Sequence, residues 1–206
     1  MGRVVVPSKL IYRLRLMLID VEPPVWRVVQ VPGNTTLFRL HLILQAAMGW
    51  TNTHRYEFLV GPLEYGYPDH EYGMPIIDGE SIQLHEIMRW PGSACGYLYD
   101  FGDDWHHILY LEGIEGRQPG MPYPRCLAGS GACPPEDVGG VTGYAEFLQV
   151  LTQPDHEEHD HFVQWAGGAF DPHTFDIAAT NQSLRRFQPR VRRSVPPLSP
   201  PGISRP

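Results

Sequence analysis

Two short stretches near the start of the chain alternate apolar and polar residues, a pattern typical of half-buried β-strands. Residues 11–20 place Arg13 and Arg15 between apolar neighbours, and residues 25–31 form a second, β-branched run. A Pro-Pro break separates the two stretches. We expect them to form the two strands of a hairpin.

A helical pattern follows this hairpin. Apolar residues over 37–47 recur at intervals of three and four, which predicts an amphipathic helix. Thr35 or Thr36 can cap its N-terminus, and Gly49 suits a left-handed C-terminal cap. Residues 54–60 predict a further strand, so the chain opens in the order β-β-α-β of a β-grasp-like unit.

The rest of the chain predicts longer loops, a second hairpin and several helices. We expect a loop over 62–79, a short helix capped by Ser81, strands over 95–101 and 105–112, an irregular segment over 116–143, helices over 144–153 and 157–167, and a last helix starting at Asp171 and Pro172. The fold class is therefore α+β: a mixed sheet, an acidic hairpin and a C-terminal helical part.

This pattern predicts a single domain over residues 1–187. Its sheet-rich part spans 10–115, and its loop and helical part spans 116–187. Residues 188–206 are rich in Arg and Pro and have almost nothing to bury, so we expect a disordered tail.

Charge and cysteine content narrow the classes of partner. The net charge is -7, while the tail over 188–206 carries Arg and no acid, so the rest of the chain is more acidic still. Such a body repels a phosphate backbone, so nucleic acid could bind only through the tail. No apolar stretch reaches the ~18 residues of a membrane span, and the 3 cysteines are too few for a disulfide framework. We expect a soluble cytoplasmic protein with reduced thiols.

The acidic hairpin carries the first candidate chemistry. A type II′ turn at Gly102 and Asp103 would make Asp100 face Trp105. Asp100, Trp105 and His107 would then share one face of the sheet, and an odd-length loop would change this partition. Asp100 and His107 would be diagonal neighbours, roughly 7–8 Å apart at the backbone. They could form a structural hydrogen bond, an acid–base pair, or part of a zinc, manganese or iron site.

A second candidate site combines cysteine and histidine. Cys126 and Cys133 are joined by a glycine-containing loop, and two thiolates brought together could supply half of a tetrahedral zinc site. His156 and His159 are spaced to share a helix face and could supply the other half. The alternative is a solvated, charged helix start. His41 lies beside the apolar stripe of its helix and favours a helix-edge histidine over a ligand.

Other motifs add little. Glu136 and Asp137 precede a Gly-Gly pair and can cap a turn or helix, or add metal ligands. The chain has no phosphate-binding loop ending in Lys-Ser/Thr, no G-x-S-x-G elbow and no H-E-x-x-H motif.

Four stretches in combination resemble a known family: "IYRLRLMLIDVEPPVWRVVQVP", "LHLILQAAMGW", "YDFGDDWHHILYLE", and "CLAGSGACPPEDVGGVTGYAEFL" with "GGAFDPHTFD". The chain resembles the plasmid pRiA-four-b ORF-three-like family, also met as an insertion-element passenger protein. The resemblance covers about residues 11–187. It implies an α+β protein without an established activity, associated with plasmids and mobile elements.

The family's hairpin motif maps onto the acidic hairpin of this chain. Tyr99, Asp103 and Trp105 become a candidate functional surface, together with Glu136 and Asp137. Many relatives have a further cysteine where this chain has Val138, which weakens a cysteine-rich metal site here. Some relatives are labelled resolvase-like, but the chain lacks the nucleophile context of a recombinase.

Three functions follow as hypotheses. The first is a non-catalytic binding or accessory domain, because no complete catalytic set of residues is evident. The second is a metal-dependent hydrolase or nuclease that uses the acidic hairpin and the cysteine–histidine segment. The third is a domain with a purely structural zinc site. The second and third require a divalent metal such as zinc.

Overall fold

A computed structural model describes residues 6–68 and 76–189. Within these residues one sheet runs in the order β5-β4-β3-β6-β7-β1-β2-β8, with antiparallel neighbours except for the parallel pair β4 and β5. The strands are β1 (Leu10–Leu18), β2 (Trp26–Pro32), β3 (Tyr56–Val60), β4 (Leu63–Gly66), β5 (Ile77–Asp78), β6 (Ala94–Tyr99), β7 (Trp105–Gly116) and β8 (Arg125–Ser130). The predicted α+β class is confirmed.

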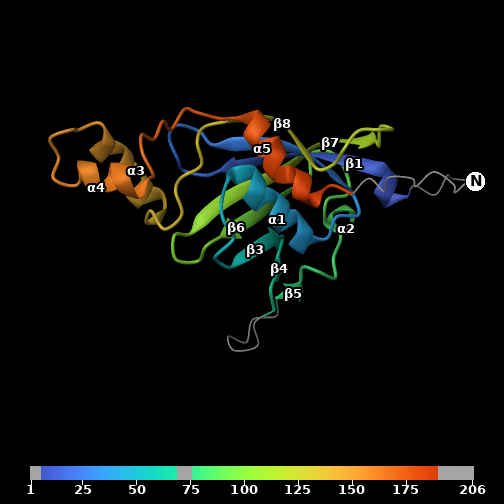
Figure 1. Cartoon of the computed structure of the whole chain (residues 1–206). Coiled ribbons are helices and arrows are strands. Elements are labelled where there is room, and N and C mark those ends of the chain that lie inside the picture. Colours follow the sequence, from blue (N-terminus) through green and yellow to red (C-terminus); the bar gives the residue numbers. More distant parts are fainter. Residues whose placement is uncertain (1–5, 69–75, 190–206) are drawn as a thin grey trace, which may run out of the picture.

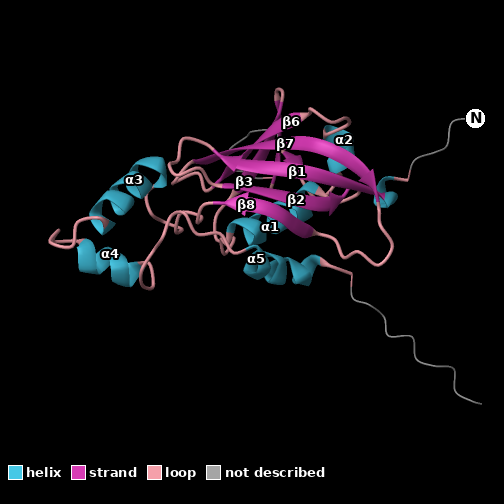
Figure 2. Ribbon diagram, turned by 90° about the horizontal axis from the view of Figure 1, so that it is seen from above, coloured by secondary structure: helices cyan, strands magenta, loops and turns pink. Residues whose placement is uncertain are grey.

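The helices are distributed unevenly around this sheet. They are α1 (Leu37–Met48), α2 (Leu84–Ile87), α3 (Gly140–Leu151), α4 (His159–Trp165) and α5 (Ile177–Leu184). Helices α1 and α5 lie side by side on one face of the sheet, while α3 and α4 project from one end of it (Figures 1 and 2). None of the described helices is long and apolar enough to cross a membrane. The predicted tail lies outside the described residues from position 190 onward.

The opening elements form where the apolar pattern predicts them. Strands β1 and β2 pair as a hairpin, and α1 packs its apolar stripe into the core. The Thr36 hydroxyl accepts a hydrogen bond from the Arg39 amide at 3.2 Å, and Gly49 closes the helix with a φ of 108°. The order β-β-α-β is present, but β6 and β7 separate β3 from β1 in the sheet.

Two predicted helix starts and two predicted irregular segments are wrong. Gln83, not Ser81, caps α2, because Gln83 and Glu86 form a reciprocal capping box. Helix α5 starts after Asp176, whose carboxylate accepts from two backbone amides; Asp171 caps only a turn. The segments expected to be irregular contain β4, β5 and β8, which are short strands held by pairing with their neighbours.

The predicted register of the acidic hairpin is also wrong. Tyr99 pairs with Trp105, and Tyr97 pairs with His107, so the loop has an odd number of residues. Asp100 and Asp104 adopt left-handed conformations with φ near 60°, and the Asp104 amide donates to the Asp100 carbonyl at 2.6 Å. This wider turn places Asp100 in the loop instead of opposite Trp105.

Candidate functional site

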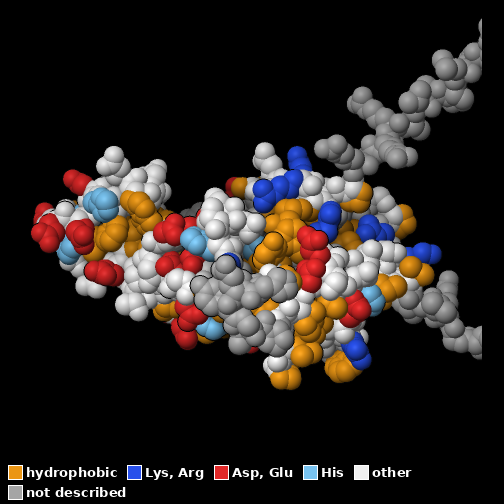
Figure 3. All heavy atoms as spheres, turned by 90° about the horizontal axis from the view of Figure 1, so that it is seen from below, with side chains coloured by type: hydrophobic (Ala, Val, Ile, Leu, Met, Phe, Trp, Pro, Cys, Tyr) orange, Lys and Arg blue, Asp and Glu red, His pale blue; other side chains and the backbone are white. Residues whose placement is uncertain are grey.

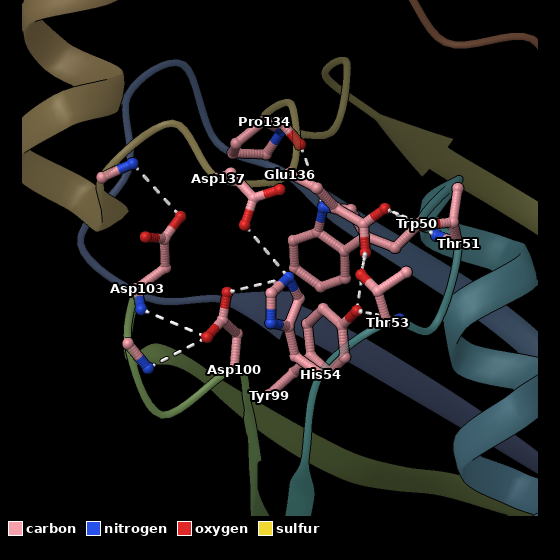
Figure 4. Close-up of polar contacts among 12 residues, drawn as sticks. Trp50, Thr51, Thr53, His54, Tyr99, Asp100, Asp103, Pro134, Glu136 and Asp137 are labelled. Atoms are coloured by element: carbon pink, nitrogen blue, oxygen red, sulfur yellow. Dashed lines mark hydrogen bonds and ion pairs between the residues drawn. The ribbon is translucent and has the colours of Figure 1, made fainter.

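Three loops distant in sequence meet at one end of the sheet (Figure 4). The first follows α1 and leads into β3, the second is the turn between β6 and β7, and the third connects β8 to α3. Their side chains form two adjoining clusters: a hydrogen-bonded network around Glu136 and a group of possible metal ligands around His54.

Packed aromatic rings support the site. The Trp50 ring stacks on Tyr99 with a centroid distance of 4.9 Å and contacts Trp105 at 6.0 Å. The Trp50 indole N–H donates to the Pro134 carbonyl at 3.0 Å. This bond ties the loop after α1 to the segment that carries Glu136 and Asp137, so both loops rest on the buried core.

Glu136 accepts hydrogen bonds from several donors on neighbouring segments. The Tyr99 hydroxyl donates to it at 2.6 Å, and the Thr51 amide donates at 2.9 Å. The Thr51 and Thr53 hydroxyls also donate to this carboxylate. Partial burial opposes ionisation, but these hydrogen bonds outweigh it and lower the pKa of Glu136. Glu136 is therefore an ionised anchor of the loop and not a free general base.

The Glu136–Tyr99 contact gives a measurable prediction. Glu136→Gln should lower the free energy of unfolding by about 1 kcal/mol, because a charge-assisted bond becomes a neutral one at a partly exposed position. Urea unfolding of Glu136→Gln, Tyr99→Phe and the double variant would measure the coupling between the two side chains. Strictly additive losses would contradict a direct contribution of this hydrogen bond.

His54, Asp100 and Asp137 form the second cluster. His54 Nε2 lies 3.1 Å from Asp137 Oδ1 and 3.6 Å from Asp100 Oδ2. One ligand atom from each residue lies within 4.8 Å of the others, and this is the one group of three or more such side chains among the described residues. His54 Nε2 is shielded from solvent, yet it makes no aligned hydrogen bond there. Imidazole and two carboxylates in this arrangement can bind a divalent metal ion.

The backbone around this cluster is unusual. Asn52, Asp100, Asp104 and Asp137 all have φ near 60°. They are four of the five non-glycine residues with positive φ in the described parts of the chain. Such conformations cost of order 1 kcal/mol or more and concentrate at functional sites. Two of these residues, Asp100 and Asp137, have side chains that face His54.

Secondary hydrogen bonds hold the Asp100 turn in place. Asp100 Oδ1 accepts from the Gly102 amide at 2.9 Å, which leaves Oδ2 facing His54. Asp103 Oδ2 accepts from the Gly139 amide at 3.2 Å and links the turn to the start of α3. The turn role predicted for Asp103 is consistent with this contact.

His107 does not meet Asp100, so the predicted Asp100–His107 pair is wrong. His107 is 2% exposed, and its Nδ1 lies 3.1 Å from both the Tyr97 and the Trp105 carbonyl oxygens. Burial lowers the pKa of His107 to about 4. It is a neutral core residue, and Asp100 pairs instead with His54.

The predicted cysteine–histidine zinc site does not assemble. Cys126 lies on β8 beside α5, where Asn181 bonds to its backbone, while His156 and His159 lie in the projecting α3–α4 part. No group of three ligands among the described residues includes any of the four predicted residues. Burial raises the pKa of the Cys126 and Cys133 thiols, so both are protonated in the metal-free protein.

The candidate surface derived from the family motif divides into buried and accessible parts. Tyr99 and Trp105 are buried and support the site, with only the Tyr99 hydroxyl reaching Glu136. The Asp103, Glu136 and Asp137 side chains lie in the site (Figure 4). Trp50, Thr51 and His54 were missed by sequence reasoning, although a Thr-Asn-Thr-His segment between a helix cap and a strand is a recognisable loop signal.

Comparisons with known proteins identify relatives of this chain. The family model described as plasmid pRiA4b ORF-3-like protein matches residues 10–179. The uncharacterized protein y4hQ of Sinorhizobium fredii is 43% identical over 180 residues, which span 84% of this chain and 87% of that protein. A crystal structure of a protein of unknown function from Methanosarcina mazei is similar with a TM-score of 0.73 and 37% identity, covering 82% of this chain and 96% of its own. The chain therefore belongs to the plasmid pRiA4b ORF-3-like family.

Proposed function

We propose that this protein is a divalent-metal-dependent hydrolase whose ion is held by His54, Asp100 and Asp137. The observation that carries the proposal is the convergence of three ligand atoms within 4.8 Å from three separate loops. A shielded imidazole nitrogen without an aligned hydrogen bond is a further argument, because a metal ion would satisfy it. The alternative of a non-catalytic binding or accessory domain stays a prediction.

The ligand set favours particular ions and a particular chemistry. Carboxylates suit Mg²⁺ and Mn²⁺, and imidazole suits Zn²⁺, so Mn²⁺ and Zn²⁺ match the mixed set best. Three protein ligands leave coordination positions open, as in catalytic sites, where the ion activates a water molecule or polarises a substrate oxygen. A pocket of about 200 Å³ is lined in part by His54, His41, Asn52 and Tyr56 and could admit a substrate.

Metal binding can be measured without knowing the substrate. We expect chelator-treated protein to bind one Mn²⁺ per chain, detected by calorimetry and by loss of the free-ion electron paramagnetic resonance signal. Asp100→Asn should weaken this binding at least tenfold, because it removes a charged ligand but retains the turn. Asp104→Asn is the matched control: the same change in the same turn, at a residue that pairs with His106 instead.

Two results would contradict the proposal at different levels. Absence of stoichiometric Mn²⁺ or Zn²⁺ binding, or equal binding by both variants, would rule out the proposed metal site. Metal binding without metal-dependent turnover of model esters, amides and phosphodiesters would rule out the proposed hydrolase function.

A further inference from the structure

A second cavity lies beside the N-terminal end of α1 and adjoins the pocket at His54, with which it shares Phe38, Tyr56 and Tyr67. Its volume is about 390 Å³. The lining residues are Phe38, Tyr56, Gly66, Tyr67, Pro68, Asp78 and Glu80. Three of these are aromatic and two are acidic, and the cavity has no basic side chain among its lining residues.

Tyr56 provides an unpartnered polar group in this cavity. The side chain is 7% exposed, and its ring stacks on His41 with a centroid distance of 3.6 Å and an interplanar angle of 7°. Among the described residues its hydroxyl makes no hydrogen bond, although Tyr56 lines the cavity. Burial, together with the Asp78 and Glu80 carboxylates, raises the pKa of Tyr56, so the hydroxyl stays neutral and free to bond to a ligand.

Asp78 and Glu80 are both exposed at the edge of the cavity, and the Asp78 carboxylate is held in place by the turn. Asp78 Oδ1 accepts from the Glu80 amide at 2.8 Å. The Gly79 amide donates to the Gly66 carbonyl at 2.9 Å, and the Phe38 amide donates to the Gly79 carbonyl at 3.1 Å. These bonds fix the turn against β4 and α1. In the described parts of the chain, neither carboxylate forms an ion pair.

The chemistry of the cavity defines what it can accept. Aromatic rings attract a cation through their negative faces, and desolvation strengthens this attraction. Carboxylates beside the rings add charge complementarity, and the Tyr56 oxygen can accept one N–H bond. A view of the face that carries β4 and β5 shows acidic and apolar side chains side by side (Figure 3). An anion would be repelled, and an uncharged apolar group would leave the carboxylates and the hydroxyl unsatisfied.

We propose that this cavity binds a primary alkylammonium group, with Asp78 and Glu80 neutralising its charge, Tyr56 accepting an N–H bond, and the rings of Phe38 and Tyr67 flanking its methylene groups. The proposal goes beyond the metal-dependent function, because it uses none of the three metal ligands. Such a group can come from a free amine or from a lysine side chain of a partner protein, and the two sources share this chemistry.

The test is an amide chemical-shift titration of isotopically labelled, chelator-treated protein. Using chelator-treated protein makes the result independent of the proposed metal site. The probes are n-butylammonium chloride and the peptide acetyl-Gly-Lys-Gly-amide, with sodium butyrate as the control of equal chain length and opposite charge. We expect saturable shifts of the Phe38, Gly66 and Gly79 amides with at least one of the two amines, and none with butyrate.

Variants test the carboxylates and the Tyr56 hydroxyl separately. Asp78→Asn combined with Glu80→Gln should weaken amine binding at least tenfold, and Tyr56→Phe should weaken it about threefold, because it removes one hydrogen bond and retains the ring. Glu64→Gln on β4 is the matched control and should leave the affinity unchanged. Thermal unfolding would verify that each variant is folded.

Each outcome decides for or against the site. Saturation by the free amine alone indicates a small-molecule ligand, and saturation by the peptide as well indicates a lysine side chain; both support the cavity. Absence of saturable shifts with either amine up to 100-fold excess over a ~1 mM binding constant, equal shifts with butyrate, or an equal loss in Glu64→Gln would overturn it.

Discussion

Gly140→Ala should lower the free energy of unfolding by about 3–5 kcal/mol, combining a strained left-handed backbone with a steric clash. Gly140 opens α3 with a φ of 67°, and a Cβ atom there would lie 2.3 Å from the Asp103 carbonyl oxygen. The clash involves two backbones and cannot be relieved by a side-chain rotation. Urea unfolding monitored by tryptophan fluorescence would measure the loss.

Gly167→Ala is the matched control for Gly140→Ala. Gly167 also has a positive φ, 78°, but a Cβ atom there meets nothing within 4 Å. It should therefore lose only the ~1–2 kcal/mol of the left-handed backbone. If both variants lost the same free energy of unfolding, the close contact between α3 and the hairpin turn would not contribute to the loss in Gly140→Ala.

The same substitution tests how the site is positioned. Asp103 belongs to the turn that carries Asp100, so displacing its carbonyl should move Asp100 away from His54. We expect Gly140→Ala to weaken Mn²⁺ binding under conditions where the variant is still folded, and Gly167→Ala to leave it unchanged. Unaltered binding in folded Gly140→Ala would show that the turn is positioned without α3.

The sequence predicts elements well where the apolar pattern is long and the caps are local. Strands β1 and β2 and helix α1 have strong periodicity, and Thr36 and Gly49 mark the helix ends. Strand β8 has no comparable signal, because it is short, contains Gly129 and lies in a Gly- and Pro-rich segment. Its identity depends on pairing with β2 and on an Asn181 side chain that bonds to the Cys126 backbone.

The candidate site depends on information that a single sequence does not carry. Asp100 and Asp137 were recognised as candidates, but neither was linked to His54, because only the sheet order and loop packing bring these three distant positions together. The hairpin loop has left-handed φ values at Asp100 and Asp104, and its five residues replace the assumed two-residue turn, so the partner of Trp105 shifts by a single residue, from Asp100 to Tyr99. That single residue decides whether Asp100 faces the core or the neighbouring loop.

Acidification from pH 7 to pH 5 should destabilise the protein by about 4 kcal/mol through two buried histidines. His41 is 1% exposed and His107 is 2% exposed, and burial lowers the pKa of each to about 4. An unfolded histidine has a pKa of ~6.5, so between pH 6.5 and pH 4 the unfolded chain binds more protons. Stability is therefore fully present above pH 6.5 and is lost as the pH falls, by about 2 kcal/mol per histidine at pH 5.

Burial outweighs the hydrogen bonds of His41 and His107, which by themselves raise the pKa of each ring. His41 Nε2 donates to Asn52 Oδ1, and its Nδ1 lies 2.8 Å from the Tyr97 hydroxyl, so the neutral ring satisfies both nitrogens. His107 Nδ1 donates to backbone carbonyls, while Nε2 is buried without a partner. A second proton on His107 would create a buried N–H without an acceptor.

His107→Leu tests this origin of the pH dependence. It should reduce the stability difference between pH 7 and pH 5 by about half, since it removes one of the two titrating groups. His106→Gln is the control at the adjacent position, because the His106 side chain is 54% exposed and should leave the difference unchanged. Urea unfolding at both pH values gives each difference directly. A wild-type stability that stays level from pH 7 to pH 5, or an equal reduction in both variants, would show that burial of these histidines does not control acid sensitivity.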